Sequence, residues 1–316
     1  MKGQFSLIMI LILLSLAACN GGGNGVQDNN VTALACSSTT ADSSFNGTTV
    51  DRIHSEDHAP NTYEQADVRT GVTMDYMVHT PASGSPKALL ILIAGGQLDA
   101  AIEGASGTGQ QATNASGNFL VRSAHLFAAQ GYKVVTIDRP SDYSLFMGGS
   151  TSNSAFDTYR TSTEHSLDLQ AIIAAENGSL GLPVAIAGTS RGTISAVAQQ
   201  DLADYILLSA PVTSGNGSPL GSPGVLPSDL GDKPVHLIWH ASDGCFVSAP
   251  AEAKQLAGEI ANVTAVEVTG GINHPELATR RNNKECDGSL TFHGFSGIES
   301  CVIQNASAWL DKQLNI

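Results

Sequence analysis

The chain has 316 residues, of which 42% are hydrophobic, so it is long enough for one large domain with a buried core. Its formal net charge is −14, and its densest basic stretch is only Arg280-Arg281 with Lys284. Because nucleic-acid binding needs concentrated positive charge, these numbers argue against a nucleic-acid partner.

The chain begins with the pattern of an export signal. An apolar run from Phe5 to Ala18 is short for a membrane span. It ends in Leu16-Ala17-Ala18-Cys19, and small residues followed directly by cysteine resemble a bacterial lipobox. We therefore expect residues 1–18 to be a signal peptide and Cys19 to be lipidated, which would anchor the exported protein to the bacterial envelope. By the same resemblance, Asn20 favours the outer membrane. The alternative is an ordinary signal peptide that happens to end at a cysteine.

Residues 19–49 have the composition of a flexible tether. They contain Gly21-Gly22-Gly23 and many Ser, Thr and Asn, and they lack apolar periodicity. Such a segment cannot bury enough surface to order itself. We expect the folded catalytic domain to span residues 50–316, with the lipid anchor as its membrane contact.

The domain alternates strands with helices. The predicted strands are 63–68, 73–79, 88–94, 132–137, 183–187, 205–208, 235–240 and 264–269, and the predicted helices are 118–130, 162–176, 194–202, 250–260 and 298–314. This order is typical of an α/β fold with a doubly wound, mostly parallel sheet and helices on both faces. Ligand sites in such sheets lie at the carboxyl ends of the strands.

One candidate nucleophile follows directly after a buried strand. Gly188-Thr189-Ser190-Arg191-Gly192 matches the G-x-S-x-G pattern, and a predicted helix comes next. The flanking glycines remove side chains that would clash in so tight a turn, and the serine Oγ would project above the sheet at a helix N-terminus. We predict that Ser190 is a nucleophile, and a plain glycine-rich turn is the alternative.

At this point residues 63–314 resemble the α/β-hydrolase superfamily, and more narrowly its exported bacterial esterase-like members. The matching pieces are Thr189-Ser190-Arg191-Gly192-Thr193 and the later His293-Gly294-Phe295-x-Gly297-x-Glu299. The resemblance implies an α/β-hydrolase fold and a catalytic triad in the chain order serine, acid, histidine.

The candidate acid is Asp243, which follows the predicted strand 235–240; an ordinary turn aspartate is the alternative. The candidate base is His293, on the loop before the closing helix, and His274 is kept in reserve. The base would take the serine proton while Asp243 stabilises the imidazolium. The other seven histidines show no metal-ligand spacing, so we expect no metal and no cofactor.

An oxyanion hole needs two backbone N–H groups. One is expected from Arg191, the residue after the nucleophile, and the other from Gly95-Gly96-Gln97 after the strand 88–94. This chain departs from the HGGG pattern because no histidine precedes the glycines. The second donor is therefore open between Gly96 and Gln97.

Four cysteines remain after Cys19. An even number in an exported protein predicts two disulfides. Because Cys245 is close to Asp243 and Cys286 is close to His293 in the sequence, we favour Cys245–Cys286, which leaves Cys36–Cys301. The rival pairing is Cys286–Cys301.

Two kinds of segment are expected around the cleft. Thr213 to Lys233, at the usual place for a cap, is rich in Gly, Ser and Pro, so we expect no helical cap. Leu98–Gly117 and Ser141–Thr161 should rim the cleft, with Leu145, Phe146 and Met147 as candidate substrate contacts.

The predicted activity is hydrolysis of a small-molecule or lipid-like carboxylic ester through an acyl-serine intermediate. A serine peptidase and an acyltransferase share this chemistry, and an inactive binding module shares the fold. Intact Ser190, Asp243 and His293 favour the enzyme.

Overall fold

The computed structural model describes residues 31–58, 60–103, 111–112, 117–150, 152–213, 227–279 and 283–316. The expected signal peptide, Cys19 and residues 20–30 lie outside these ranges. Within them, no helix combines the length and the apolar character needed to cross a membrane.

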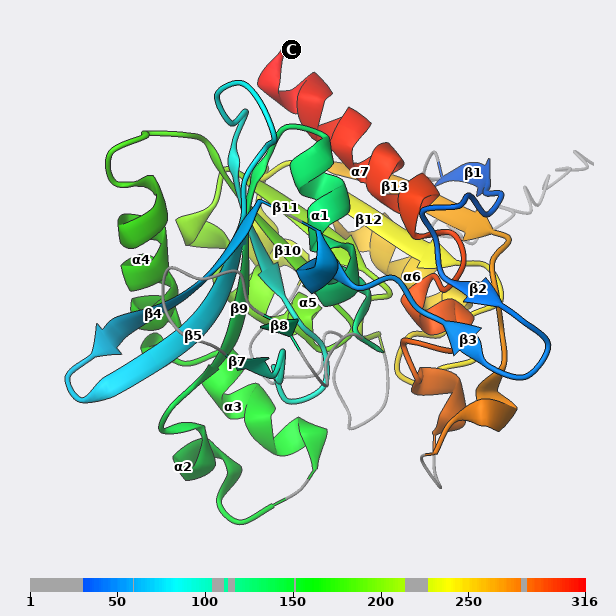
Figure 1. The fold of residues 1–316 in the computed structure, drawn as a ribbon, viewed down its shortest axis with the longest axis horizontal. Coiled ribbons are helices and arrows are strands. Elements are labelled where there is room, and N and C mark those ends of the chain that lie inside the picture. The colour runs from blue at the N-terminus through cyan, green and yellow to red at the C-terminus, as the bar shows by residue number, and fades with distance from the viewer. Residues whose placement is uncertain are drawn as a thin grey trace, which may run out of the picture.

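A nine-stranded sheet forms the centre of the described fold, with the strand order β1-β13-β12-β11-β10-β6-β9-β5-β4 (Figure 1). Its strands are β1 (Val31–Ala35), β4 (Asn61–Arg69), β5 (Val72–His79), β6 (Leu89–Ile93), β9 (Lys133–Pro140), β10 (Val184–Thr189), β11 (Tyr205–Ser209), β12 (Val235–His240) and β13 (Val263–Thr269). The strands from β1 to β9 in this order are parallel, and β5 and β4 form an antiparallel edge. Two small ribbons pair β2 (Ser44–Phe45) with β3 (Val50–Asp51) and β7 (Ile102–Glu103) with β8 (Gln111–Ala112).

Helices cover both faces of the sheet. α1 (Phe119–Ala129) and α7 (Glu299–Leu314) pack on one face, while α4 (Thr163–Asn177), α5 (Gly192–Ala198) and α6 (Pro250–Glu259) pack on the other (Figure 1). The short helices are α2 (Tyr143–Met147), α3 (Asp157–Arg160) and the 3-10 turns η1 (Ser55–Asp57), η3 (Asn153–Phe156), η4 (Gln200–Leu202), η6 (Pro227–Leu230), η7 (Pro275–Leu277), η8 (Lys284–Cys286) and η9 (Phe292–Gly294). Every residue of β6 is fully buried, as its continuous apolar run predicts for a central parallel strand. The predicted α/β architecture is confirmed.

The functional edge of the sheet follows from the strand order. β6 and β10 are neighbours, with Leu89 opposite Val184 and Ile93 opposite Gly188. The chain leaves β6 for β9 on one side and builds β10, β11, β12 and β13 on the other. In a doubly wound sheet, such a switch point opens a crevice at the carboxyl ends of the two strands. Ser190 follows the end of β10 directly, and Gly95 lies two residues after the end of β6.

The expected tether is wrong for residues 31–49, which are part of the fold. β1 pairs in parallel with β13 from Val31 to Ala35, and the Cys36 N–H donates to the Thr269 carbonyl at 2.9 Å. The Asp42 carboxylate accepts from the Ser300 N–H at 2.6 Å in the first turn of α7. An edge strand is held by backbone hydrogen bonds and needs no strict apolar alternation, so composition did not reveal it.

The segment between β11 and β12 bears on the expectation that no helical cap is present. Residues 214–226 lie outside the described residues, and the flanking described part carries the short turn η6.

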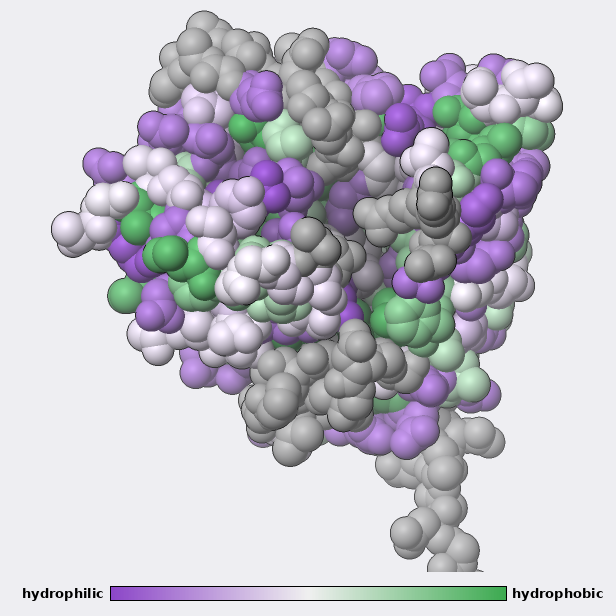
Figure 2. Space-filling model, turned by 90° about the horizontal axis from the view of Figure 1, so that it is seen from below, coloured by the Kyte–Doolittle hydropathy of each residue, from purple (hydrophilic) through white to green (hydrophobic). Residues whose placement is uncertain are grey.

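On the face seen in Figure 2, hydrophobic side chains occur in small groups between hydrophilic ones, which is usual for a protein surface.

Candidate active site

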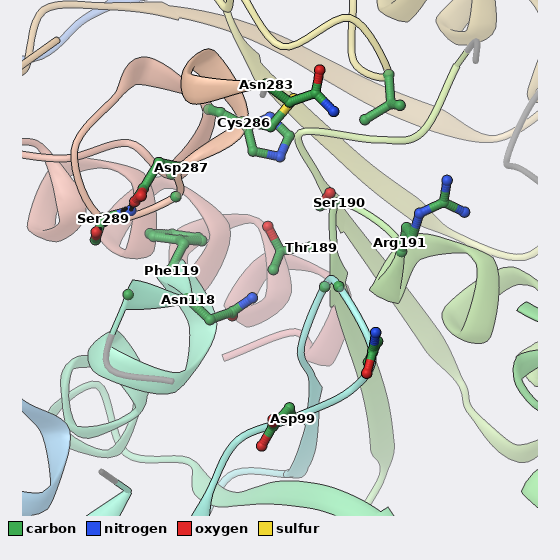
Figure 3. A pocket seen from close by; sticks show the side chains of 18 of the residues that line it. Asp99, Asn118, Phe119, Thr189, Ser190, Arg191, Asn283, Cys286, Asp287 and Ser289 are labelled. Atoms are coloured by element: carbon green, nitrogen blue, oxygen red, sulfur yellow. Dashed lines mark hydrogen bonds between the residues drawn. The ribbon is translucent and has the colours of Figure 1, made fainter. Parts of the chain in front are cut away.

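Ser190 occupies a strained turn between β10 and α5. Its φ is +50°, a value that side-chain-bearing residues rarely adopt. A Cβ at Gly188 would lie 2.2 Å from the Gly192 carbonyl oxygen, and one at Gly192 would lie 2.2 Å from the Ile93 carbonyl oxygen. The Thr193 N–H and hydroxyl both donate to the Ser190 carbonyl, at 2.9 and 2.6 Å. The two glycines of the motif are therefore required by backbone packing, and the turn presents Ser190 to the cleft (Figure 3).

His293 and Asp243 meet although they are 50 residues apart. The His293 Nδ1 lies 2.9 Å from Asp243 Oδ2, and the Asp243 side chain is fully buried. The Cys245 N–H donates to the other carboxylate oxygen at 2.8 Å. Because Nδ1 donates to the carboxylate, Nε2 is the ring nitrogen left to accept a proton. His293 and Ser190 line the same cleft.

The reserve histidine lies elsewhere. His274 Nδ1 is 2.8 Å from Glu276 Oε1, and its ring stacks on Phe45 with centroids 3.7 Å apart. The structure brings His293, and not His274, to Asp243 and to the cleft that Ser190 lines.

Both disulfides have the pairing that the sequence favoured. Cys245 is joined to Cys286, and Cys36 is joined to Cys301. The first bond connects the loop of Asp243 to the loop of His293. The second connects the end of β1 to α7, which explains why residues after 31 belong to the domain.

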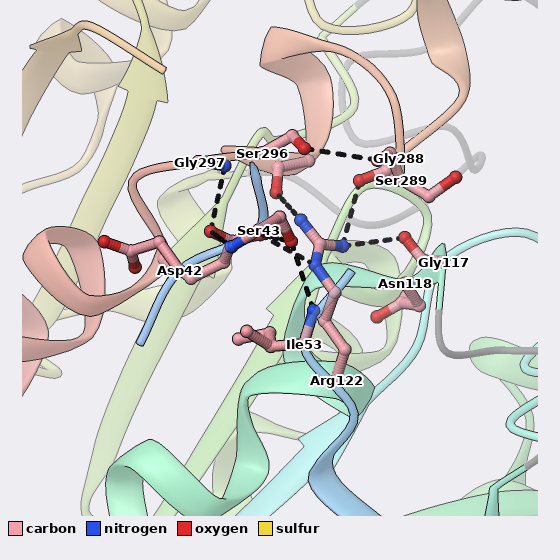
Figure 4. Close-up of polar contacts among 12 residues, drawn as sticks. Asp42, Ser43, Ile53, Gly117, Asn118, Arg122, Gly288, Ser289, Ser296 and Gly297 are labelled. Carbon is pink, nitrogen blue, oxygen red and sulfur yellow. Dashed lines mark hydrogen bonds and ion pairs between the residues drawn. The ribbon is translucent and has the colours of Figure 1, made fainter. Parts of the chain in front are cut away.

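A buried ion pair supports the loop of His293 (Figure 4). Arg122 Nε lies 3.0 Å from Glu299 Oε1, and both side chains are fully buried. The same guanidinium donates to the carbonyls of Gly117, Gly288 and Gly294 at 2.8, 2.9 and 2.5 Å. Glu299 also accepts from the Gly297 N–H at 2.9 Å, which accounts for the spacing of the glycines and the glutamate in the second motif. Burial lowers the pKa of Arg122, and Glu299 opposes that shift.

Sequence reasoning missed Arg122. It lies among mostly apolar residues of α1, and a buried charge there needs a buried partner. That conflict was the available signal.

His240 contacts both the loop that carries Asp243 and the loop that carries His293. Its Nδ1 accepts from the Ser242 N–H at 3.0 Å, so Nε2 carries the proton and donates to the Gly270 carbonyl at 2.8 Å. Its ring stacks on Phe292, next to His293, with centroids 4.0 Å apart. Burial lowers the pKa of His240, which favours this neutral form. The sequence pointed to no such role.

The candidate oxyanion loop touches the nucleophile. A Cβ at Gly95 would lie 3.0 Å from the Ser190 Cβ, and Gly95, Gly96, Gln97 and Arg191 all line the cleft. Gly96 has a φ of +56°. The predicted donors on both sides of the hole thus lie beside Ser190.

The cleft has a volume of about 840 Å³ and a mostly polar lining. Its polar side chains include Arg52, Gln97, Asp99, Asn118, Ser152, Ser154, Asn283, Asp287 and Ser289. The expectation for Leu145, Phe146 and Met147 is wrong. None of the three lines the cleft: Leu145 is 76% exposed, Phe146 packs against Tyr159, and Met147 is buried in the core. Within the described ranges, no group of three or more His, Cys, Asp or Glu side chains could hold a metal ion.

No protein-family model and no curated protein matches the chain. Among solved structures, Est1E from Butyrivibrio proteoclasticus with bound ferulic acid has a TM-score of 0.51 at 13% identity, over 80% of this chain and 100% of that chain. A second structure of Est1E has a TM-score of 0.50 at 12% identity, over 81% and 100%. An alpha-beta serine hydrolase homologue from Coxiella burnetii has a TM-score of 0.46 at 16% identity, over 80% and 96%.

At such low identities this likeness concerns the fold, and function is argued from the site. The elbow at Ser190 lies at the switch point of a mostly parallel sheet, with helices on both faces. The chain has the α/β-hydrolase fold.

Proposed function

We propose that this protein is a serine hydrolase that cleaves a carboxylic ester through an acyl-Ser190 intermediate. The observation that carries the proposal is the buried Asp243–His293 hydrogen bond at the cleft lined by Ser190. A nucleophile on a strained elbow and a histidine oriented by a carboxylate form the arrangement that acyl transfer requires.

In the first half-reaction the Ser190 Oγ forms a bond to the ester carbonyl carbon, and its proton moves to His293 Nε2. The carbonyl electron pair moves to oxygen, where the Arg191 N–H and the 95–97 loop stabilise the negative charge. Asp243 stabilises the imidazolium. The bond between carbon and the alcohol oxygen then breaks, and His293 protonates the departing alkoxide.

In the second half-reaction water attacks the acyl-enzyme. His293 Nε2 takes the proton from water, and the hydroxyl adds to the carbonyl carbon. The ester bond to Ser190 breaks, the proton returns from His293 to Ser190 Oγ, and the carboxylic acid leaves. Atoms and charges balance without any further reactant.

The polar lining supports a small polar ester over a lipid-like one. Long acyl chains need continuous apolar walls. The walls contributed by Ser152, Ser154 and Ser289 offer hydroxyl groups instead. We expect kcat/KM to be highest for short acyl groups on polar alcohols, which a series of esters of rising acyl length would measure.

Labelling with a fluorophosphonate tests the nucleophile. We expect the wild type to be labelled and Ser190→Ala not to be. Ser154→Ala, which removes another hydroxyl from the same cleft, should label like the wild type. An unlabelled wild type, or a labelled Ser190→Ala, would contradict the proposal.

Comparison of two histidine variants tests the base. His293→Ala should lose ester turnover by at least about 10³-fold, since the base and its partner act as a unit. His274→Ala should retain it. The reverse result would reject His293 as the base.

Export and lipidation at Cys19 belong to the same proposal. Two disulfides are typical of proteins that fold in oxidising compartments. We expect radiolabelled palmitate to be incorporated into the wild type and not into Cys19→Ser, and the wild type to fractionate with the outer membrane. Recovery of unlabelled wild-type protein in the soluble fraction would contradict this.

A further inference from the structure

Helix α3 lies behind the candidate oxyanion loop, and its last residue is a fully buried arginine. Arg160 Nη2 donates to the carbonyls of Ala94, Gly95 and Gly96 at 3.0, 3.3 and 3.1 Å. Its Nη1 donates to Ser195 Oγ at 2.9 Å, in helix α5. One guanidinium therefore donates hydrogen bonds to three consecutive carbonyls of the loop after β6.

Because the peptide group is planar, these carbonyl contacts also determine the directions of the neighbouring N–H groups. In a trans peptide the carbonyl of one residue and the N–H of the next point in opposite directions. The carbonyls of residues 94–96 face Arg160. The N–H groups of residues 95–97 therefore point away from Arg160. Residues 95–97 line the cleft, and a Cβ at Gly95 would lie 3.0 Å from the Ser190 Cβ.

The same helix also holds the other side of the hole. Asp157, one turn before Arg160, accepts a hydrogen bond from the Arg191 guanidinium. Arg191 is the residue whose backbone N–H is the expected first donor. Asp157 Oδ1 lies 3.9 Å from Arg160 Nε, so one carboxylate faces both arginines. Side chains of α3 thus contact both segments that carry the expected donors.

The loop has a strained backbone that needs such support. Gly96 and Leu98 both have positive φ values, +56° and +64°, and Leu98 is fully buried. A leucine adopts this conformation only where its surroundings enforce it. Charged hydrogen bonds from one buried arginine to three successive carbonyls supply that enforcement.

We infer that Arg160 is a positioning residue for the oxyanion hole, and that Asp157 places the Arg191 donor through the same helix. The inference rests on the proposed ester hydrolysis and deepens it. Arg160 touches no substrate atom in this scheme; it sets the N–H groups that do.

The first test is Arg160→Lys, which keeps the charge but loses the planar fork that bonds several carbonyls at once. We expect kcat to fall by about 10- to 100-fold and KM to change by less than about 3-fold, because the donors act mainly on the developing oxyanion. The inhibition constant of a trifluoromethyl ketone, whose adduct with Ser190 carries that oxyanion, should rise by a factor close to the loss in kcat. A general loss of structure would not produce this parallel.

The matched control is Arg69→Lys. Arg69 is another arginine with several hydrogen bonds and is partly buried; its bonds go to the carboxylates of Asp142 and Asp168, but it lies on β4 at an edge of the sheet. It should leave kcat and the inhibition constant unchanged. Urea unfolding of each variant reports whether it is folded.

Asp157→Asn keeps the test decisive if Arg160→Lys does not fold. It weakens the hold on Arg191 without removing the buried arginines, and it should lower kcat and inhibitor affinity together. The inference is overturned if folded Arg160→Lys has the kcat and inhibitor affinity of the wild type, or if only its KM changes. If Arg160→Lys does not fold, the same outcomes for folded Asp157→Asn overturn it. If the wild type itself neither hydrolyses esters nor reacts with a fluorophosphonate, the proposed function fails instead.

Discussion

Arg122 and Arg160 each lie fully buried behind one side of the cleft, and each donates to three backbone carbonyls. Their charges are balanced differently. Arg122 forms a direct ion pair with Glu299 at 3.0 Å. The carboxylate nearest Arg160 is Asp157, whose Oδ1 is 3.9 Å away and which also pairs with Arg191. Burial lowers the pKa of Arg160 to about 10.

The segments that the two arginines join also differ. Arg122 donates hydrogen bonds to the carbonyls of Gly117, Gly288 and Gly294, which come from separate segments of the chain. Its partner Glu299 accepts a hydrogen bond from the Ser43 hydroxyl at 2.6 Å. Arg160 bonds three consecutive residues of one loop. The first arrangement holds the fold around the base loop together, whereas the second shapes a single loop. We therefore expect substitutions at the Arg122 site to reduce mainly stability, and substitutions at the Arg160 site to reduce mainly turnover.

Among the single substitutions, removal of Glu299 gives the largest expected effect on stability. Glu299→Ala leaves Arg122 as an unpaired buried charge and releases Ser43 and Gly297. Breaking one side of a buried pair costs about 3–5 kcal/mol, so the free energy of unfolding should fall by that amount in urea titrations. The matched control is Glu259→Ala, an exposed glutamate of α6, which should change it by less than about 0.5 kcal/mol. A loss below about 1 kcal/mol for Glu299→Ala would mean that the two arginine sites do not differ as described.

Removal of the Cys245–Cys286 disulfide should reduce both stability and turnover. This bond closes a loop with a sequence separation of 41, for which the chain-entropy relation gives about 4 kcal/mol, and engineered cases deliver less. The variant Cys245→Ala/Cys286→Ala should also lose kcat, because the loops of Asp243 and His293 are no longer joined. Enzyme assays and urea unfolding measure the two effects.

The second disulfide is the control for this variant. Cys36→Ala/Cys301→Ala removes a bond between β1 and α7, away from the cleft, and should reduce stability while kcat is retained. If both double variants lose kcat equally, the Cys245–Cys286 bond has no special role at the site.

Much of this fold was accessible from local patterns. The buried strands and amphipathic helices follow from continuous apolar runs and from helix periodicity, and Ser190 was visible because a five-residue motif lay between a strand and a helix. Asp243 was found because it follows a predicted strand at the carboxyl edge of the sheet. His293 was preferred over His274 because the resemblance to α/β hydrolases places the base on the loop before the closing helix.

The elements that were missed depend on distant partners. β1 is ordered by β13, more than 200 residues away along the chain, and composition alone favoured disorder. Helix α3 has four residues, too few for any periodicity, although it carries Asp157 and Arg160. Folding brings both arginines to their carbonyl partners: those of Arg122 come from separate segments of the chain, and those of Arg160 lie in a loop more than 60 residues before it. No local pattern records that.

The smallest predicted effect concerns Asp138, the second anchor of the loop that Arg160 holds. Its carboxylate accepts from the N–H groups of Ala100 and Ile102 at 3.1 and 2.8 Å, and burial raises its pKa to about 6. A carboxyl whose pKa is higher in the folded protein stabilises it most below the unfolded pKa near 3.8, and this contribution is lost as the pH rises to about 6. Asp138→Asn cannot titrate. The difference in unfolding free energy, wild type minus variant, should therefore decrease by no more than about 3 kcal/mol between pH 4 and pH 6 and stay constant above pH 7. Urea titrations at several pH values measure it. A difference that does not vary with pH would show that the pKa of Asp138 is the same in the folded and the unfolded protein, which would contradict the prediction.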